Sequence, residues 1–271
     1  PSRQTTGPQI TTIAVLPLKN LTGDPGQDYF VDGMTEALTA TFSRISVFSV
    51  ISSTSTMHYR NTEKLAPEIA RELGGVDALV EGSVVKSGNH LRVTVALIHA
   101  STDRRLWSGT YDYDVADVFA LYNDIAKVVG HEISVAISES DQARLAKARV
   151  VKPEAYDAYV RGSQLIRHWM SGGCIEAERH FLQAIELDRT FALPYADLAW
   201  CSVFPDRLQR PVAELGPRAR AYATQAIALD PFLARAYVVL GLVAHRLDFD
   251  WAAAEPLLKR GIALDHSDGI G

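Results

Sequence analysis

Residues 184–200 read AIELDRTFALPYADLAW, and residues 226–242 read AIALDPFLARAYVVLGL. A third copy of the motif, GIALDHSDGIG, begins at Gly261, so the copies start at 184, 226 and 261, 42 and 35 residues apart. A period near 34 residues is typical of stacked helix pairs, each of which buries its apolar face only against a neighbouring pair. The second half of the chain is therefore predicted to form an array of helical hairpins.

Small and aromatic residues in this half resemble the tetratricopeptide repeat. Tyr237, Leu240 and Gly241 fit the first helix of that repeat, and Leu258 and Gly261 fit the second. The resemblance covers three repeats within residues 153–266, at about 153–189, 190–231 and 232–266. It implies an all-α solenoid, and small residues where its helices approach closely.

The repeats depart from this pattern in two places. Arg189 stands where the first repeat would close with a proline. The stretch from Pro205 to Pro217 is predicted to be a loop about eight residues longer than the repeat requires. We expect the apolar face of the last helix to be covered by more chain, a partner or a second copy of this chain.

The first helix of each repeat is expected to line a concave surface. The residues projected onto it are Tyr159, Ser163, Arg167, Ala196, Trp200, Arg235, Val238, Leu242, His245 and Arg246. Of these, we select Tyr159, Arg167, Trp200, Arg235, His245 and Arg246 as candidate residues for binding an extended peptide or an acidic tail. The alternative is that these side chains pack against the first half of the chain or against the long loop.

The first half alternates the patterns of strands and helices. Strands are expected at residues 13–18, 47–51, 78–86, 91–100 and 105–113, and helices at 28–44, 64–73 and 115–138. The expected strands carry apolar runs or alternation, and the expected helices carry apolar residues at helical spacing. The order βαβαβββα predicts a mixed α/β sheet with helices over one face.

Two blocks carry a second resemblance. Residues 13–38, IAVLPLKNLTGDPGQDYFVDGMTEAL, and residues 76–107, VDALVEGSVVKSGNHLRVTVALIHASTDRRLW, are similar to the TolB amino-terminal-like domain. This implies such a domain over residues 13–140, after a linker at 1–12, and implies no catalytic residue. In bacterial regulatory proteins the domain often sits between an upstream effector, as in CadC-like winged-helix regulators or nucleotide cyclases, and downstream tetratricopeptide repeats. It also occurs in envelope or secretion-associated proteins.

Composition restricts the possible partners. The net charge of −5 gives neither half the basic surface that phosphate backbones require, so this chain is not expected to bind nucleic acid. No apolar run is long enough to span a bilayer.

The chain opens on Pro1, and we expect it to be a piece of a longer protein. Cys174 and Cys201 could form a disulfide, but two small buried thiols are the favoured interpretation, which fits a reducing, cytoplasmic location, with the periplasm as the alternative.

Candidate sites of chemistry are few. Asp24, Asp28, Asp32 and Glu36 are spaced by four residues, which favours helix capping and solvation over a cation site. Residues 20–27 lack the lysine and the spacing of a phosphate-binding loop, and no motif of a zinc protease or serine hydrolase is present. Trp107, Tyr111 and Tyr113 are interpreted as a strand face. We expect no catalytic residue, no cofactor and no metal in this fragment.

The leading hypothesis is a non-catalytic region for regulation and protein interaction within a bacterial signalling or transcription-regulatory protein. An effector, such as a winged-helix DNA-binding domain or a nucleotide cyclase, is expected upstream. The alternative is a structural or assembly component of the envelope or of a secretion system. A protein or peptide partner is expected, and self-association through the terminal repeat or a sheet edge is predicted.

Overall fold

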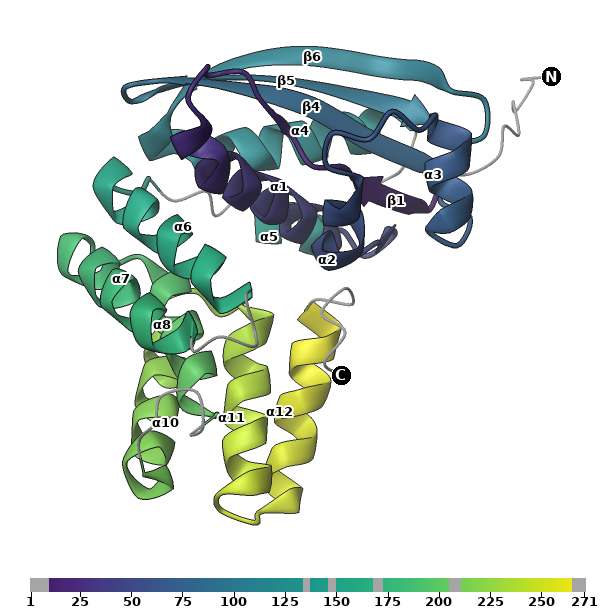
Figure 1. Cartoon of the computed structure of the whole chain (residues 1–271). Helices are drawn as coiled ribbons and strands as arrows, with labels where there is room; N and C mark the ends of the chain where they lie inside the picture. The colour runs from purple at the N-terminus through teal and green to yellow at the C-terminus, as the bar shows by residue number, and fades with distance from the viewer. Residues whose placement is uncertain (1–9, 134–136, 146–149, 168–172, 205–210, 265–271) are drawn as a thin grey trace. The chain divides into compact units, whose positions relative to one another are not determined.

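The computed structural model of the chain describes residues 10–133, 137–145, 150–167, 173–204 and 211–264 (Figure 1). The chain divides into two compact units. The first comprises Pro1–Asp114 and Phe119–Arg149, and the second comprises Val115–Val118 and Val150–Gly271.

The first unit is a mixed α/β domain built on a six-stranded sheet. Its elements are β1 (Thr12–Val15), β2 (Lys19–Asn20), the 3-10 helix η1 (Pro25–Gln27), α1 (Asp28–Ser43), β3 (Ser49–Val50), α2 (Ser53–Thr56), the 3-10 helix η2 (Met57–Tyr59), α3 (Ala66–Glu72), β4 (Ala78–Ser87), β5 (His90–His99), β6 (Arg104–Asp114), α4 (Val118–Glu132) and α5 (Glu139–Leu145). The strand order is β3-β1-β4-β5-β6, and β2 also pairs with β4. Pairs among β1, β2, β3 and β4 are parallel, whereas β4-β5 and β5-β6 are antiparallel.

The first predicted strand, residues 13–18, ends early, and a separate short strand follows it. Strand β1 ends at Val15 and β2 begins at Lys19, with Pro17 between them. Proline has no N–H group to donate to a sheet ladder, so it interrupts the strand. Single backbone bonds continue the contact with β4, from the Leu16 N–H to Val80 and from the Leu21 N–H to Val84. The hydroxyl of Thr35 on α1 accepts the N–H of Leu18 and keeps this segment against the helix.

The expected helices over one face of the sheet are present, and α3 adds a cover at one end of the other face. Leu79 and Ile98 lie opposite each other on one face, where they cluster with Ile69 and other residues of α3. The other face carries Tyr113, whose hydroxyl donates to Asp124 of α4 at 2.5 Å. Alternation of side chains along a strand sends neighbouring residues to opposite faces, and apolar residues on both faces require a cover on each.

Asp77 fastens β1 to the start of β4. One oxygen of its carboxylate accepts the backbone N–H groups of Thr11, at 3.0 Å, and Thr12, at 2.8 Å, as well as the Thr11 hydroxyl. Burial raises the pKa of Asp77, but these hydrogen bonds outweigh it, and the pKa lies below its ordinary value. The ionised carboxylate is therefore part of the folded sheet.

The second unit consists of helices arranged as three successive hairpins. Its main helices are α6 (Pro153–Arg167), α7 (Gly173–Leu187), α8 (Ala192–Ser202), α10 (Val212–Leu229), α11 (Ala234–Arg246) and α12 (Trp251–Leu264). The paired helices are α6 with α7, α8 with α10, and α11 with α12. Neighbouring hairpins meet through α7 with α8 and through α10 with α11. The sequence repeat thus corresponds to a repeated helix pair.

The junctions between hairpins use the same hydrogen bonds 42 residues apart. The Asp188 N–H donates to Ala184 and the Asp230 N–H donates to Ala226. The carboxylate of each aspartate accepts the backbone N–H two residues later, at 2.9 Å for Asp188 and 3.0 Å for Asp230. The hydroxyls of Tyr195 and Tyr237 then each donate to the carbonyl six residues before them.

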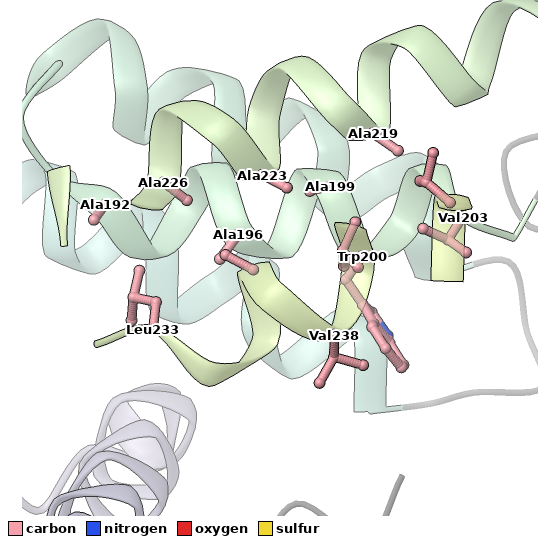
Figure 2. Packing of buried hydrophobic residues seen from close by; sticks show 13 residues of the cluster. Ala192, Ala196, Ala199, Trp200, Val203, Ala219, Ala223, Ala226, Leu233 and Val238 are labelled. Atoms are coloured by element: carbon pink, nitrogen blue, oxygen red, sulfur yellow. The ribbon is translucent and has the colours of Figure 1, made fainter. Parts of the chain in front are cut away.

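Alanine side chains fill the space between α8 and α10 (Figure 2). Ala199 of α8 and Ala219, Ala223 and Ala226 of α10 are fully buried. Small side chains let two helix backbones approach closely. The first hairpin uses glycine for the same purpose, because a Cβ on Gly162 of α6 would lie 2.6 Å from the Phe181 ring of α7.

Two expectations for this unit are wrong. Cys174 of α7 and Cys201 of α8 form a disulfide with a Cα–Cα distance of 5.6 Å, instead of two free thiols. Each cysteine looked like a small apolar residue of its own helix, and only the packing of the two hairpins brings them together. The predicted loop ending at Pro217 is also shorter than expected, since α10 begins at Val212 and contains Pro217.

Candidate peptide-binding surface

Trp200 of α8 lies at the centre of the residues that the structure brings together from the predicted surface. Its indole is 6% exposed and lies in the apolar cluster that contains Val238 of α11 (Figure 2). The Phe204 ring meets it edge to face, with centroids 5.1 Å apart. The guanidinium carbon of Arg235 stands 5.9 Å from the centroid of the indole. These distances are within the range of aromatic and cation–π attraction.

Arg235 also forms an ion pair with Asp197, one helical turn before Trp200. Asp197 is 2% exposed, and its second oxygen, Oδ2, has no hydrogen-bond partner among the described residues. Removing the cation beside a buried carboxylate strongly destabilises the fold, because it leaves a buried charge without compensation. The pair therefore holds Arg235 against the indole.

Arg246 lies at the end of α11, and its guanidinium carbon is 5.8 Å from the centroid of the Phe204 ring. Its side chain is exposed. Asp197, Trp200, Phe204, Arg235 and Arg246 form what we call the tryptophan cluster. The charge of Arg235 is already matched by Asp197, and the cluster presents the exposed guanidinium of Arg246 beside aromatic rings, a combination suited to a peptide with aromatic and acidic residues.

The remaining predicted residues lie in other surroundings. Tyr159 of α6 packs on Phe181 and Phe191, with ring centroids 6.0 and 5.1 Å away. The ring of His245 of α11 meets the ring of Trp251 of α12 edge to face, with centroids 4.4 Å apart. The side chain of Arg167 lies outside the described residues. The structure thus brings Trp200, Arg235 and Arg246 together, and it places Tyr159 and His245 in separate aromatic contacts.

Other members of the predicted inner face contribute packing. Ala196 and Val238 are buried, and Leu242 is half-buried. Ser163 of α6 is buried, and its hydroxyl has no hydrogen-bond partner among the described residues. The sequence reasoning missed Asp197 and Phe204. Asp197 could have been identified because it is the single charged residue in the otherwise apolar stretch ALPYADLAW.

Three of the four acidic residues predicted near α1 have local roles. The Asp24 carboxylate caps η1 by accepting the Gly26 N–H at 2.8 Å. Asp28 accepts the Asn20 amide at 2.6 Å, and Asp32 pairs with Arg60. In the described parts of the chain, no group of three or more His, Cys, Asp or Glu side chains is arranged to hold a metal ion.

A shallow hollow of about 600 Å³ lies between α10 and the end of α11. It is lined by Ala213, Gly216, Pro217, Arg220, Ala221, Thr224, Gln225, Leu247 and Asp248. Arg220 is already paired with Asp248 at 2.5 Å. Arg220 and Asp248 are the ionisable residues of this lining, and they pair with each other. The hollow therefore lacks the several convergent ionisable groups of an acid–base site.

Among the described helices, none combines the length and apolar character needed to cross a membrane. The sequence matches no family model. It is 30% identical over 240 residues to "Putative adenylate cyclase 3" from Rhizobium meliloti (strain 1021), a match that covers 82% of this chain and 41% of that protein. The chain thus spans about two fifths of the length of this curated relative.

Solved structures with weak likeness are TolB-like or lipoprotein folds. TolB from Acinetobacter baumannii has a TM-score of 0.34 and 13% identity, over 46% of this chain and 29% of TolB. Lipoprotein GNA1162 from Neisseria meningitidis has a TM-score of 0.33 and 17% identity, over 46% of this chain and 98% of the lipoprotein. The C-terminal domain of LpoB from Salmonella enterica has a TM-score of 0.31 and 16% identity, over 41% of this chain and 87% of that domain.

Proposed function

We propose that this chain is a non-catalytic region for regulation and protein interaction within a larger bacterial signalling protein, whose effector is a nucleotide cyclase. The observation that carries the proposal is the 240-residue match to a protein named as an adenylate cyclase, of which the match covers only 41%. The other part of such a protein has room for a catalytic domain. A winged-helix DNA-binding effector is the alternative within the same class.

The three hairpins support an interaction role. We assign them to the tetratricopeptide class because the junction bonds at Asp188 and Asp230 repeat, and because Gly162 and Gly241 both lie against a large side chain of the following helix. Arrays of this class bind partners on an extended surface. Within it, the tryptophan cluster is the proposed contact for an acidic peptide segment.

The first experiment separates a regulatory region from an enzyme. The purified 271-residue chain is incubated with ATP and Mg²⁺ or Mn²⁺, and cyclic AMP is measured. We expect no cyclic AMP above the level of buffer. Formation of cyclic AMP by this chain, abolished by a point substitution within it, would overturn the proposal.

The second experiment tests regulation in the full-length protein that carries the chain. Arg246→Ala removes the exposed cation beside Phe204, and Arg179→Ala removes an exposed arginine of α7 as the matched control. We expect Arg246→Ala to change cyclic AMP output several-fold while Arg179→Ala leaves it unchanged. Equal output from both variants and the parent would contradict a regulatory role for the tryptophan cluster.

The disulfide favours a second candidate, an envelope or secretion-associated component. Disulfides persist mainly in oxidising compartments such as the bacterial periplasm, and Cys174–Cys201 joins two helices of the second unit. Trapping of thiols with an alkylating reagent in intact cells distinguishes the candidates. Oxidised cysteines in the native host favour the envelope reading, and reduced cysteines favour a cytoplasmic signalling protein.

A further inference from the structure

Strand β6 forms an open edge of the sheet in the first unit (Figure 1). It pairs along its length with β5 on one side, and no strand among the described residues pairs with its other side. It is eleven residues long, and every one of them is exposed or half-buried. An edge of this kind presents backbone N–H and C=O groups that can extend the sheet with another strand.

The centre of β6 lacks the features that usually prevent such pairing. Residues 106–111, LWSGTY, contain no charge and no proline. The bulge opposite Leu97 and Ile98 is confined to the first end of the strand, and the register with β5 is regular from Trp107 to Asp114. Charges or prolines along an edge protect it from association, so this central part is available for pairing.

The charges at the two ends of β6 determine which strand fits. Arg104 and Arg105 lie at its start, and Asp112 and Asp114 lie at its end. A parallel copy of the same strand would place like charges together, whereas an antiparallel copy centred on Gly109 places Arg104 of each strand opposite Asp114 of the other and brings the basic end of each strand to the acidic end of its partner. Opposite charges across two strands stabilise the pair, and like charges destabilise it.

An antiparallel copy related by a two-fold axis at Gly109 also matches the uncharged residues. Trp107 then lies opposite Tyr111 of the second copy, and Ser108 opposite Thr110. Within one chain the indole of Trp107 already lies across Gly109, where a Cβ would approach its ring atoms at 2.5 and 2.8 Å. Paired aromatic residues stabilise neighbouring strands.

From these observations we propose that two copies of this chain associate through antiparallel pairing of their β6 strands, which joins their sheets into one. The contact is closed by symmetry, because each strand supplies both the basic and the acidic end. Asp112 pairs with Arg92, and Asp114 with His90, on the exposed surface beside this edge. Surface pairs of this kind are weak, so the aspartates can share their charge with the second copy.

The experiment uses two charge-reversal variants of the whole chain. One is Arg104→Glu with Arg105→Glu, and the other is Asp112→Lys with Asp114→Lys. Light scattering and sedimentation between about 1 and 100 μM measure the mass of each, and circular dichroism verifies folding. We expect the parent chain to dimerise and each variant alone to bind itself roughly tenfold or more weakly.

Mixing the variants provides the decisive outcome. One variant then has acidic residues at both ends of β6 and the other has basic residues at both ends, so a heterodimer has complementary charges throughout. We expect the mixture to recover the dimer mass, which only folded chains can do. A monomeric parent chain at 100 μM, a dimer unaffected by both reversals, or a mixture that stays monomeric would each overturn the proposal.

Discussion

Arg235 of α11 pairs with Asp197 of α8, so one ion pair joins the second hairpin to the third. Asp197 is 2% exposed, and its Oδ2 has no hydrogen-bond partner among the described residues. The arginine therefore has two roles in the structure, since it neutralises a buried carboxylate and also stands over the indole of Trp200.

Replacing Arg235 by Ala is predicted to destabilise the second unit by about 3 kcal/mol, because it leaves the Asp197 carboxylate buried without its cation. The double variant Asp197→Leu with Arg235→Met should recover most of this loss, because both charges are replaced by apolar groups. Urea unfolding of the parent, single and double variants measures these free energies. A loss below about 1 kcal/mol in Arg235→Ala would show that the carboxylate is solvated without the arginine.

Removal of the Cys174–Cys201 disulfide is predicted to lower the stability of the second unit by roughly 3 kcal/mol. The bond closes a loop with a sequence separation of 27 residues, and opening it gives the unfolded chain more freedom. Thermal unfolding with and without a reductant measures the effect. The Cys174→Ala, Cys201→Ala double variant is the control, because its melting temperature should not respond to the reductant. An unchanged melting temperature for the reduced parent would contradict the prediction.

Asp77→Asn is predicted to cost about 1–2 kcal/mol at pH 7, because an amide oxygen accepts the Thr11 and Thr12 donors more weakly than a carboxylate. The pKa of Asp77 is lower in the folded chain than its ordinary value, so this stabilisation is present above about pH 4. It is lost as the pH falls through the folded pKa. Urea unfolding at pH 7 and at successively lower pH should show the difference between parent and variant shrinking.

Glu81→Gln is the matched control for this pH dependence, because it removes an exposed carboxylate from β4 of the same sheet. It should change the unfolding free energy little at either pH. A difference between the parent and Asp77→Asn that stays constant from pH 7 down to pH 2 would exclude the carboxylate as its origin.

Gly162→Ala is predicted to destabilise the first hairpin by about 1–3 kcal/mol, although alanine normally favours a helix over glycine. The new methyl group would lie 2.6 Å from the Phe181 ring. Phe181→Leu in the same chain should relieve the clash, so the double variant should lose less than the sum of the two single losses. Thermal or urea unfolding of all four proteins measures this coupling. Strictly additive losses would show that the two residues do not interact.

Much of the α/β unit could be predicted because its periodicity is local. The helix expected at residues 28–44 is α1, Asp28–Ser43, and the strands expected at 78–86 and 91–100 are β4 and β5 within one residue at each end. Helix α2, Ser53–Thr56, was not predicted. Its four residues, STST, are neither good helix formers nor apolar, and the Ser52 side chain caps the turn.

The candidate surface was less predictable because it depends on contacts between hairpins. The spacing of residues within a repeat placed Trp200, Arg235 and Arg246 on one side. It could not reveal that Asp197 binds Arg235 or that Phe204 lies between Trp200 and Arg246, since these contacts depend on the offset between α8 and α11. For the same reason the sequence left the disulfide as the less favoured alternative, because Cys174 and Cys201 belong to different hairpins.

The matching bonds at Asp188 and Asp230 make the two junctions interchangeable. Excising the 42 residues from one aspartate to the other would connect α7 directly to α11. The turn between these two helices would keep the hydrogen bonds that Asp188 and Asp230 now make. A duplication between the same points would insert an additional hairpin just as smoothly. The geometry of the turns is therefore compatible with arrays that differ in length by whole hairpins.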